Sequence, residues 1–190
     1  MEPITNRVAE SDIVVFNLED LWDEHPILEF DLEPFLFEGL VLREKDFREK
    51  VKAHDWQQYD GAHVAVFCSA DAIVPTWAYM LIATKLHGMA RSVAMGTSKE
   101  LVRDHFVRAV ETVDWSRYAG LPVVIKGCGS KLVPHDAYLL AATKLQAVAD
   151  KLMYGEPCSS VPLWRRPADT TRPKVAATKP AVPASLKRTS

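Results

Sequence analysis

The three cysteines of this 190-residue chain stand where thiols could act chemically. Cys68 ends an apolar run in Phe-Cys-Ser-Ala-Asp, Cys128 ends another in Lys-Gly-Cys-Gly-Ser, and Cys158 follows a third in Tyr-Gly-Glu-Pro-Cys. The ends of parallel strands meet at one edge of a sheet, where ligands gather. Two of the cysteines also precede predicted helices, whose N-termini favour the thiolate, the nucleophilic and metal-binding form. We therefore predict a cysteine site for a metal ion or part of an iron–sulfur cluster.

Polar residues near the cysteines complete this candidate site. His135 is the predicted fourth metal ligand, and the further predicted binding residues are Ser69, Asp71, Ser130 and Asp136. Two other roles stay open for the thiols: packing as small hydrophobic groups, or sulfur transfer and redox chemistry as nucleophiles. No Cys-x-x-Cys pair is present, which is the spacing that would make a metal assignment specific.

The segments that must position the cysteines occur twice. Asp-Trp-x-x-Tyr-x-Gly begins at Asp55 and again at Asp114, and a longer pattern begins at Val74 and again at Val133, each time 59 residues later. Between residues 42–96 and 101–155, 19 of 55 aligned pairs are identical. Self-similarity at a fixed spacing indicates an internal duplication. We attribute the repeated Trp, Tyr, Pro and Leu residues to packing.

Each copy predicts a βαβα unit. The predicted strands are 64–68, 92–95, 123–127 and 151–154, and the predicted helices are 43–52, 77–87, 98–112 and 134–148. Strands that alternate with helices are typical of an α/β fold with a mainly parallel sheet flanked by helices. Right-handed crossovers would place the four strands side by side in one sheet. Two N-terminal strands, 12–18 and 26–30, are expected to extend that sheet, with an antiparallel direction left open.

Composition predicts one α/β domain over residues 1–165 and a disordered tail over 166–190. The tail is rich in Pro, Ala and Thr, with six basic residues and one acidic residue, and has too little apolar surface to form a core. The preceding residues carry a net charge of −7, which disfavours nucleic-acid binding.

The chain has no run of 18 apolar residues and no basic region followed by an apolar one at its start. We therefore expect no membrane span and no secretory signal. Free thiols fit a reducing compartment, so we expect a cytoplasmic protein. No nucleotide-binding glycine motif, Gly-x-Ser-x-Gly elbow or His-Glu-x-x-His motif is present, so these enzyme classes lack support.

Four strings stand out together: they begin at Leu36 (Leu-Phe-Glu-Gly-Leu), Arg43 (Arg-Glu-Lys-Asp-Phe-Arg), Cys68 (Cys-Ser-Ala-Asp-Ala-Ile-Val-Pro) and Met153 (Met-Tyr-Gly-Glu-Pro-Cys). Together they resemble the DUF2480 family, an uncharacterised family found mainly in Bacteroidetes. The resemblance covers about residues 3–165 and brings no established activity. It implies an association, through gene neighbourhood, with SUF-type iron–sulfur cluster assembly. The strand–Ser/Cys-loop–helix unit is also similar to STAS-like domains, which act by binding partners.

The leading hypothesis is an accessory factor in iron–sulfur or sulfur metabolism, in which Cys68, Cys128 and Cys158 bind metal, cluster or persulfide and protein partners belong to the assembly machinery. The alternative is a non-catalytic STAS-like interaction module. A small-molecule enzyme that uses the same edge is the third hypothesis, and a non-enzymatic role is favoured over it. No catalytic residue is assigned. Convergence of the three sulfurs on one point would support the first hypothesis.

Overall fold

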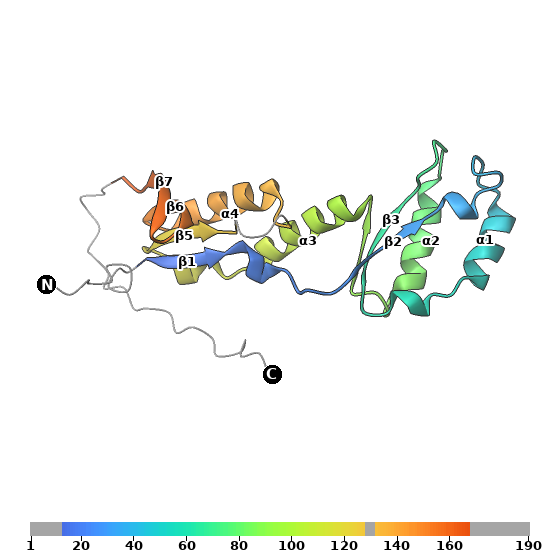
Figure 1. The fold of residues 1–190 in the computed structure, drawn as a ribbon, viewed down its shortest axis with the longest axis horizontal. Coiled ribbons are helices and arrows are strands. Elements are labelled where there is room, and N and C mark those ends of the chain that lie inside the picture. Colours follow the sequence, from blue (N-terminus) through green and yellow to red (C-terminus); the bar gives the residue numbers. More distant parts are fainter. Residues whose placement is uncertain (1–12, 128–131, 168–190) are drawn as a thin grey trace, which may run out of the picture. The chain divides into compact units, whose positions relative to one another are not determined.

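The computed structural model describes residues 13–127 and 132–167. This part of the chain divides into two compact units. The continuous unit consists of residues 22–108, and the split unit consists of the described residues up to Leu21 and from Ala109 onwards. Each unit has a sheet of its own, so the fold is α/β with two mostly parallel sheets flanked by helices (Figure 1). None of the helices in these residues has the length and apolar character needed to span a bilayer.

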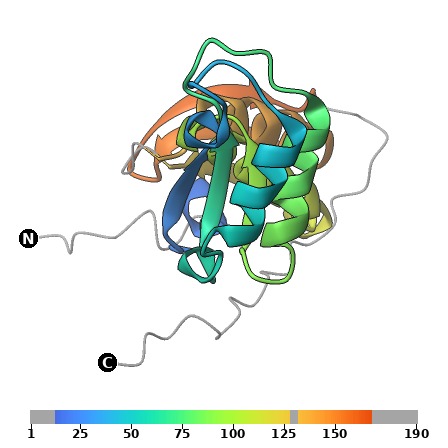
Figure 2. The ribbon, with the colours of Figure 1, turned by 90° about the vertical axis from the view of Figure 1, so that its right-hand side faces the viewer.

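The continuous unit has a three-stranded parallel sheet in the order β2-β3-β4. Its elements are β2 (Ile27–Asp31), α1 (Glu44–Ala53), β3 (His63–Phe67), α2 (Thr76–Leu86) and β4 (Ser92–Met95). Both α1 and α2 lie beside the sheet, next to one another (Figure 2). Successive side chains of a strand point to opposite faces, so one set of residues in β3 faces these helices.

The core of the continuous unit lies between the sheet and these two helices. Val64 and Val66 of β3 belong to one buried cluster with residues of β2, α1 and α2, which include Phe30, Phe47, Val51, Ala78, Ile82 and Leu86. In α1 the buried residues are four apart, and in α2 they recur every four residues, so each helix turns one stripe towards the sheet. Cys68 is packed at the margin of this cluster.

The split unit has a four-stranded sheet in the order β1-β5-β6-β7, in which only the β6–β7 pair is antiparallel. Its elements are β1 (Val14–Asn17), β5 (Pro122–Lys126), α4 (His135–Val148), β6 (Lys151–Glu156) and β7 (Ser159–Arg165). Helix α4 packs against β5 and β6. Helix α3 (Ser98–Thr112) contributes its residues to Arg108 to the continuous unit and the rest to the split unit. Short 3-10 helices complete the fold at Leu18–Leu21, Glu33–Phe35, Gln57–Tyr59 and Trp115–Tyr118.

The predicted placement of the four repeated strands in one sheet is wrong. β3 pairs with β2 and β4, whereas β5 pairs with β1 and β6, so neither central strand has an edge left for the other half. Both N-terminal strands are parallel to their neighbours, which excludes the antiparallel alternative. Strand β7 was not predicted. The single domain predicted for residues 1–165 stays a prediction, and the predicted tail lies outside the described residues from 168 onwards.

Element boundaries recur at the spacing of the sequence repeat. β3 begins at His63 and β5 at Pro122, 59 residues later, and both strands have five residues. Gly61 and Gly120, which stand at equivalent positions before these strands, have φ angles of +68° and +71°. This left-handed conformation favours glycine and forms the turn into each buried strand. The internal duplication itself stays a prediction, with which these spacings agree.

His54, at the end of α1, is surrounded by aromatic rings. Its ring centroid lies 4.8 Å from that of Trp56 and 5.4 Å from those of Phe30 and Phe35. Burial among these rings lowers the pKa of His54, although the nearby charge of Asp55 opposes the shift.

We predict that a His54→Phe substitution flattens the pH dependence of stability. Folded His54 binds its proton more weakly than unfolded His54 does, so the fold loses stability as the pH falls below about 6.5 and through the folded pKa. Urea unfolding between about pH 5 and pH 7.5 measures this slope. The matched control is His87→Phe at an exposed position, which should keep the wild-type slope.

We also predict that Ile82→Ala destabilises the protein by about 2–5 kcal/mol, because Ile82 is fully buried between α2 and the sheet. Met80 lies on the same helix but is 63% exposed, so Met80→Ala should change stability by less than about 0.5 kcal/mol. Chemical denaturation measures both. Equal effects would show that the core does not lie on the sheet side of α2.

Candidate metal centre

Asp23, His25 and His63 come together at the amino end of the sheet in the continuous unit. Asp23 and His25 lie in the segment before β2, and His63 is the first residue of β3. The His63 backbone N–H donates to the carbonyl of Pro26 at 2.8 Å, which fixes this segment beside the strand. On the other side, His63 is in register with Ser92, the first residue of β4.

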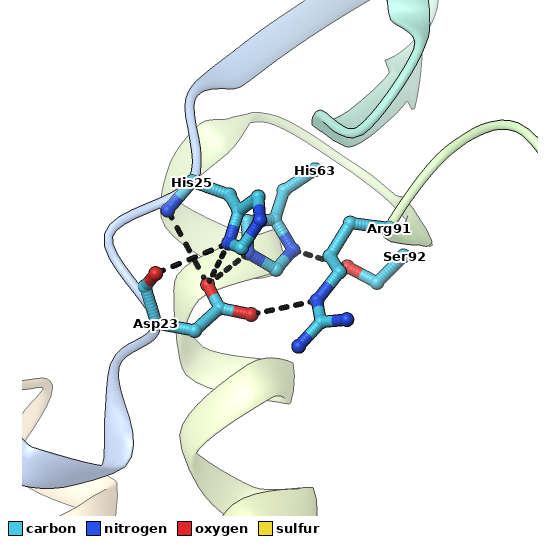
Figure 3. Close-up of polar contacts among 5 residues, drawn as sticks. All are labelled: Asp23, His25, His63, Arg91 and Ser92. Atoms are coloured by element: carbon cyan, nitrogen blue, oxygen red, sulfur yellow. Dashed lines mark hydrogen bonds and ion pairs between the residues drawn. The ribbon is translucent and has the colours of Figure 1, made fainter. Parts of the chain in front are cut away.

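The Asp23 carboxylate is the centre of the cluster (Figure 3). Its Oδ1 lies 2.7 Å from His63 Nε2 and 3.4 Å from His25 Nδ1. One ligand atom from each of these three residues lies within 4.8 Å of the other two. Arg91 donates from Nε to Asp23 Oδ2 at 2.9 Å.

His63 is 1% exposed and has partners at both ring nitrogens. Its Nε2 donates to the ionised Asp23, because a carboxylate can only accept. Its Nδ1 lies 2.7 Å from Ser92 Oγ, a hydroxyl that can either donate or accept. The Ser92 hydroxyl can therefore donate to the unprotonated Nδ1 and hold the ring in place.

The charge of Asp23 is strongly stabilised. Burial alone would raise the pKa of this carboxyl, but the hydrogen bonds from His63 and Arg91 outweigh burial and hold the pKa well below its usual range. Asp23 is therefore ionised at any physiological pH and available as an anionic ligand.

Aromatic rings cover the other side of His63. The Trp22 ring centroid lies 4.9 Å from that of His63 and 4.6 Å from that of His105. Trp22 also stacks on Phe106 at 6.1 Å, with an angle of 19° between the ring planes. These rings keep water from one side of the imidazole, whereas His25 remains 43% exposed at the opening.

Two imidazoles and one carboxylate form a ligand set that suits first-row divalent metals. The same combination with open positions is typical of non-haem Fe(II) sites, and two His with one carboxylate also bind catalytic zinc. Ligand atoms about 2.1 Å from a tetrahedral metal are about 3.4 Å apart. The Asp23–His25 distance already matches that spacing, and the Asp23–His63 pair would open by about 0.7 Å.

A family model described as protein of unknown function (DUF2480) matches residues 2–166 of the chain. The chain belongs to the DUF2480 family. The resemblance drawn from its sequence strings is thereby confirmed. Comparison with curated proteins and with solved structures found no match.

The cysteine site predicted for this DUF2480 protein falls in both units and partly outside the described residues. Cys68 follows β3 in the continuous unit and is half-buried, whereas Cys158 lies in the turn between β6 and β7 of the split unit and is exposed. Cys128 and Ser130 lie outside the described residues. Convergence of the three sulfurs therefore stays a prediction.

The remaining predicted site residues belong to the starts of helices and to one loop. His135 and Asp136 are exposed in the first turn of α4, in the split unit. Asp71 is exposed in the loop before α2. The backbone N–H of Ser69 donates to Asp31 Oδ1 at 2.9 Å, so Ser69 joins the carboxyl ends of β2 and β3.

Sequence reasoning missed the ligand set of Asp23, His25 and His63 because it searched the carboxyl ends of the strands. Two signals were present. Asp23 and His25 form an Asp-x-His pair before a strand, and His63 opens a strand of otherwise apolar residues. A histidine at the first position of a buried strand needs partners for both nitrogens, and these came from segments distant in sequence.

We predict that Asp23→Ala destabilises the DUF2480 protein by about 1–3 kcal/mol, because the buried Nε2 of His63 loses its acceptor. Thermal or urea unfolding in the presence of a chelator measures the loss. Glu24→Gln, at the exposed neighbouring position, is the control and should be close to neutral. Equal stability of the Asp23→Ala variant and the wild type would refute the proposed role of this hydrogen bond.

Proposed function

We propose that this DUF2480 protein binds a divalent transition metal through Asp23, His25 and His63, and serves as an accessory factor in iron–sulfur cluster or sulfur metabolism. The observation that carries the metal proposal is the meeting of three ligand atoms within 4.8 Å around an ionised carboxylate. The metabolic setting is supported by the family resemblance alone.

Ser92 supports the proposal because it gives His63 a second partner. A metal-bound imidazole usually donates its other N–H to a nearby acceptor, which orients the ring and raises its basicity. Ser92 Oγ, 2.7 Å from Nδ1, can accept that proton when a metal replaces Asp23 as the partner of Nε2.

Arg91 is expected to keep the metal exchangeable. Its guanidinium contacts the same carboxylate that would bind the metal, and its positive charge opposes a second cation nearby. The Arg91 side chain is 54% exposed, so it has room to turn towards solvent when a metal binds. An accessory protein that delivers a metal needs to release it, and a site of reduced affinity suits that role.

The predicted cysteine site remains part of the proposal as a separate ligand set. Cys68, Cys128 and Cys158, with His135, would accept a metal, a cluster or a persulfide. Among the described residues, Cys68 lies beyond the carboxyl end of β3, whereas the Asp23–His25–His63 ligands lie at the amino end of the same sheet. Partner binding of the STAS-like kind stays a prediction.

We predict that the purified protein binds one Fe(II), Co(II) or Zn(II) ion at the Asp23–His25–His63 centre, and that His25→Ala weakens binding at this centre about 100-fold. Ser92→Ala should weaken it about tenfold, as expected when the partner of a metal-bound histidine is lost. Anaerobic Fe(II) titration, Co(II) absorption spectroscopy and Zn(II) calorimetry measure the affinities. His25 is exposed, so its loss tests the ligand without disturbing the core.

The controls separate this centre from the thiols. His87→Ala, at an exposed position, should bind metal as the wild type does, and a variant with all three cysteines changed to Ser should retain the site. Arg91→Gln should raise the affinity about tenfold by removing the opposing charge. Metal binding that survives His25→Ala but disappears with the cysteines would transfer the function to the predicted cysteine site.

A further inference from the structure

A pocket of about 510 Å³ opens at the carboxyl end of β2 in the continuous unit. It lies between the residues that end this strand, the short helix at Glu33–Phe35 and the last turns of α1. Its size falls in the range of small-molecule sites. The metal centre lies at the amino ends of β2 and β3, so the two sites occupy opposite ends of the same sheet.

The walls of the pocket are mainly aromatic. Phe30, Phe35, Tyr59 and His54 line it, and their rings contact one another at centroid distances of 4.9–6.0 Å. Phe30 and Tyr59 are almost completely buried and form the base of the pocket, whereas Phe35 and His54 are half-buried and keep ring surface exposed to it. Such walls favour an apolar or planar group, because aromatic rings stack on it and bury its surface.

His54 is a polar residue of the pocket lining. Its Nε2 is within hydrogen-bond distance of Tyr59 Oη and of the Gln58 side chain.

Two opposite charges line the pocket without pairing. Lys50 donates from Nζ to the carbonyls of Pro34 at 2.8 Å and Leu36 at 3.2 Å, which leaves one of its three N–H groups for a ligand. Asp31 accepts from the backbone N–H groups of Glu33 and Ser69, each at 2.9 Å. Lys50 and Asp31 form no ion pair within 4.0 Å.

Asp31 keeps its charge at neutral pH. Burial alone would raise the pKa of Asp31, but hydrogen bonds from Ser69 and Glu33 outweigh burial and lower it. Aromatic walls therefore stand beside one fixed cation and one fixed anion.

We propose that this pocket binds a small zwitterion with an aromatic or apolar body, of the α-amino-acid class. The body packs against the exposed ring surfaces of Phe35 and His54, the carboxylate takes the free donor of Lys50, and the ammonium faces Asp31. A ligand with one charge would leave either Lys50 or Asp31 without an opposite charge, so the pocket selects for ligands that carry both. The inference uses none of the metal ligands and holds independently of the proposed function.

The other half of the sequence repeat supports a specialised role for this pocket. At the equivalent positions 59 residues later, Ala109 stands for Lys50 and Val113 stands for His54, whereas the Trp and Tyr are retained as Trp115 and Tyr118. The packing residues are shared, and Lys50 and His54 are replaced by apolar residues in the other half.

Calorimetry on the full-length protein with four probes tests the proposal. L-phenylalanine carries both charges and the ring, 3-phenylpropionate lacks the ammonium, 2-phenylethylamine lacks the carboxylate, and glycine lacks the ring. We expect phenylalanine to bind at least about tenfold more tightly than each of the other three. Equal binding of the three aromatic probes, or no binding of phenylalanine at millimolar concentration, would overturn the proposal.

Variants with reciprocal effects separate recognition from folding. Lys50→Met should weaken phenylalanine and 3-phenylpropionate about tenfold and leave 2-phenylethylamine unchanged. Asp31→Asn keeps an acceptor oxygen for Glu33 and Ser69, and should weaken phenylalanine and 2-phenylethylamine but spare 3-phenylpropionate. Lys52→Met, on the same helix but outside the pocket lining, is the matched control and should bind all probes as the wild type does.

A blocking variant tests the location. Ala53 lines the pocket and is exposed, so Ala53→Trp fills the space without removing a contact of the core. It should abolish phenylalanine binding while the melting temperature stays near that of the wild type. Unchanged affinity in Ala53→Trp, or the same loss for all probes in both charge variants, would place binding elsewhere.

Discussion

The hydrogen bond between His63 and Asp23 is the constraint on which the continuous unit depends. The imidazole of His63 is 1% exposed, and this hydrogen bond gives its buried Nε2 a partner. Without that partner, the desolvated nitrogen would destabilise the fold. Because Asp23 precedes β2 and Ser92 begins β4, the two partners of His63 connect all three strands at their amino ends. The polar contacts thus set the positions at which the strands begin, and the apolar cluster on the helix side then determines how they pack.

The residues of this contact differ between the two halves of the repeat. The position equivalent to His63 is Pro122 in β5, and the position equivalent to Ser92 is Lys151 in β6. Val64 and Val123 occupy equivalent positions in β3 and β5, and both are completely buried. Each central strand therefore keeps its apolar core residue. The two halves therefore share core packing residues. They differ in polar residues at strand ends, where side chains have fewer core neighbours.

Much of the secondary structure was predictable because it depends on local pattern. The boundaries of β4 and the end of α3 were predicted to the residue, and those of the other repeated elements fall within a few residues of the structure. Strand partnership was not predictable in the same way, because β1 and β2 each pair with a distant strand. Strand β7 contains Pro162, which argues against a strand unless the segment lies at an edge, as β7 does.

The candidate site shows the same division between local and distant information. The buried ring nitrogen of His63 needs a hydrogen-bond partner. No local sequence pattern identifies Asp23, which lies 40 residues earlier, as that partner. The cysteines follow the predicted strands, so the predicted site lay at the opposite, carboxyl ends of those strands. The sequence therefore carried the chemical types of the ligands, and the topology of the sheet determined which of them meet.

The pairing of β1 with β5 has a consequence for the order in which the chain acquires structure. Val14 lies opposite Val123, so the split unit joins segments at the two ends of the described chain, whereas residues 22–108 are continuous. During synthesis, the whole continuous unit is made before β5, the strand that pairs with β1. Closing a long loop carries a larger entropic cost than forming local contacts. The continuous unit is therefore the part of this protein that can fold first.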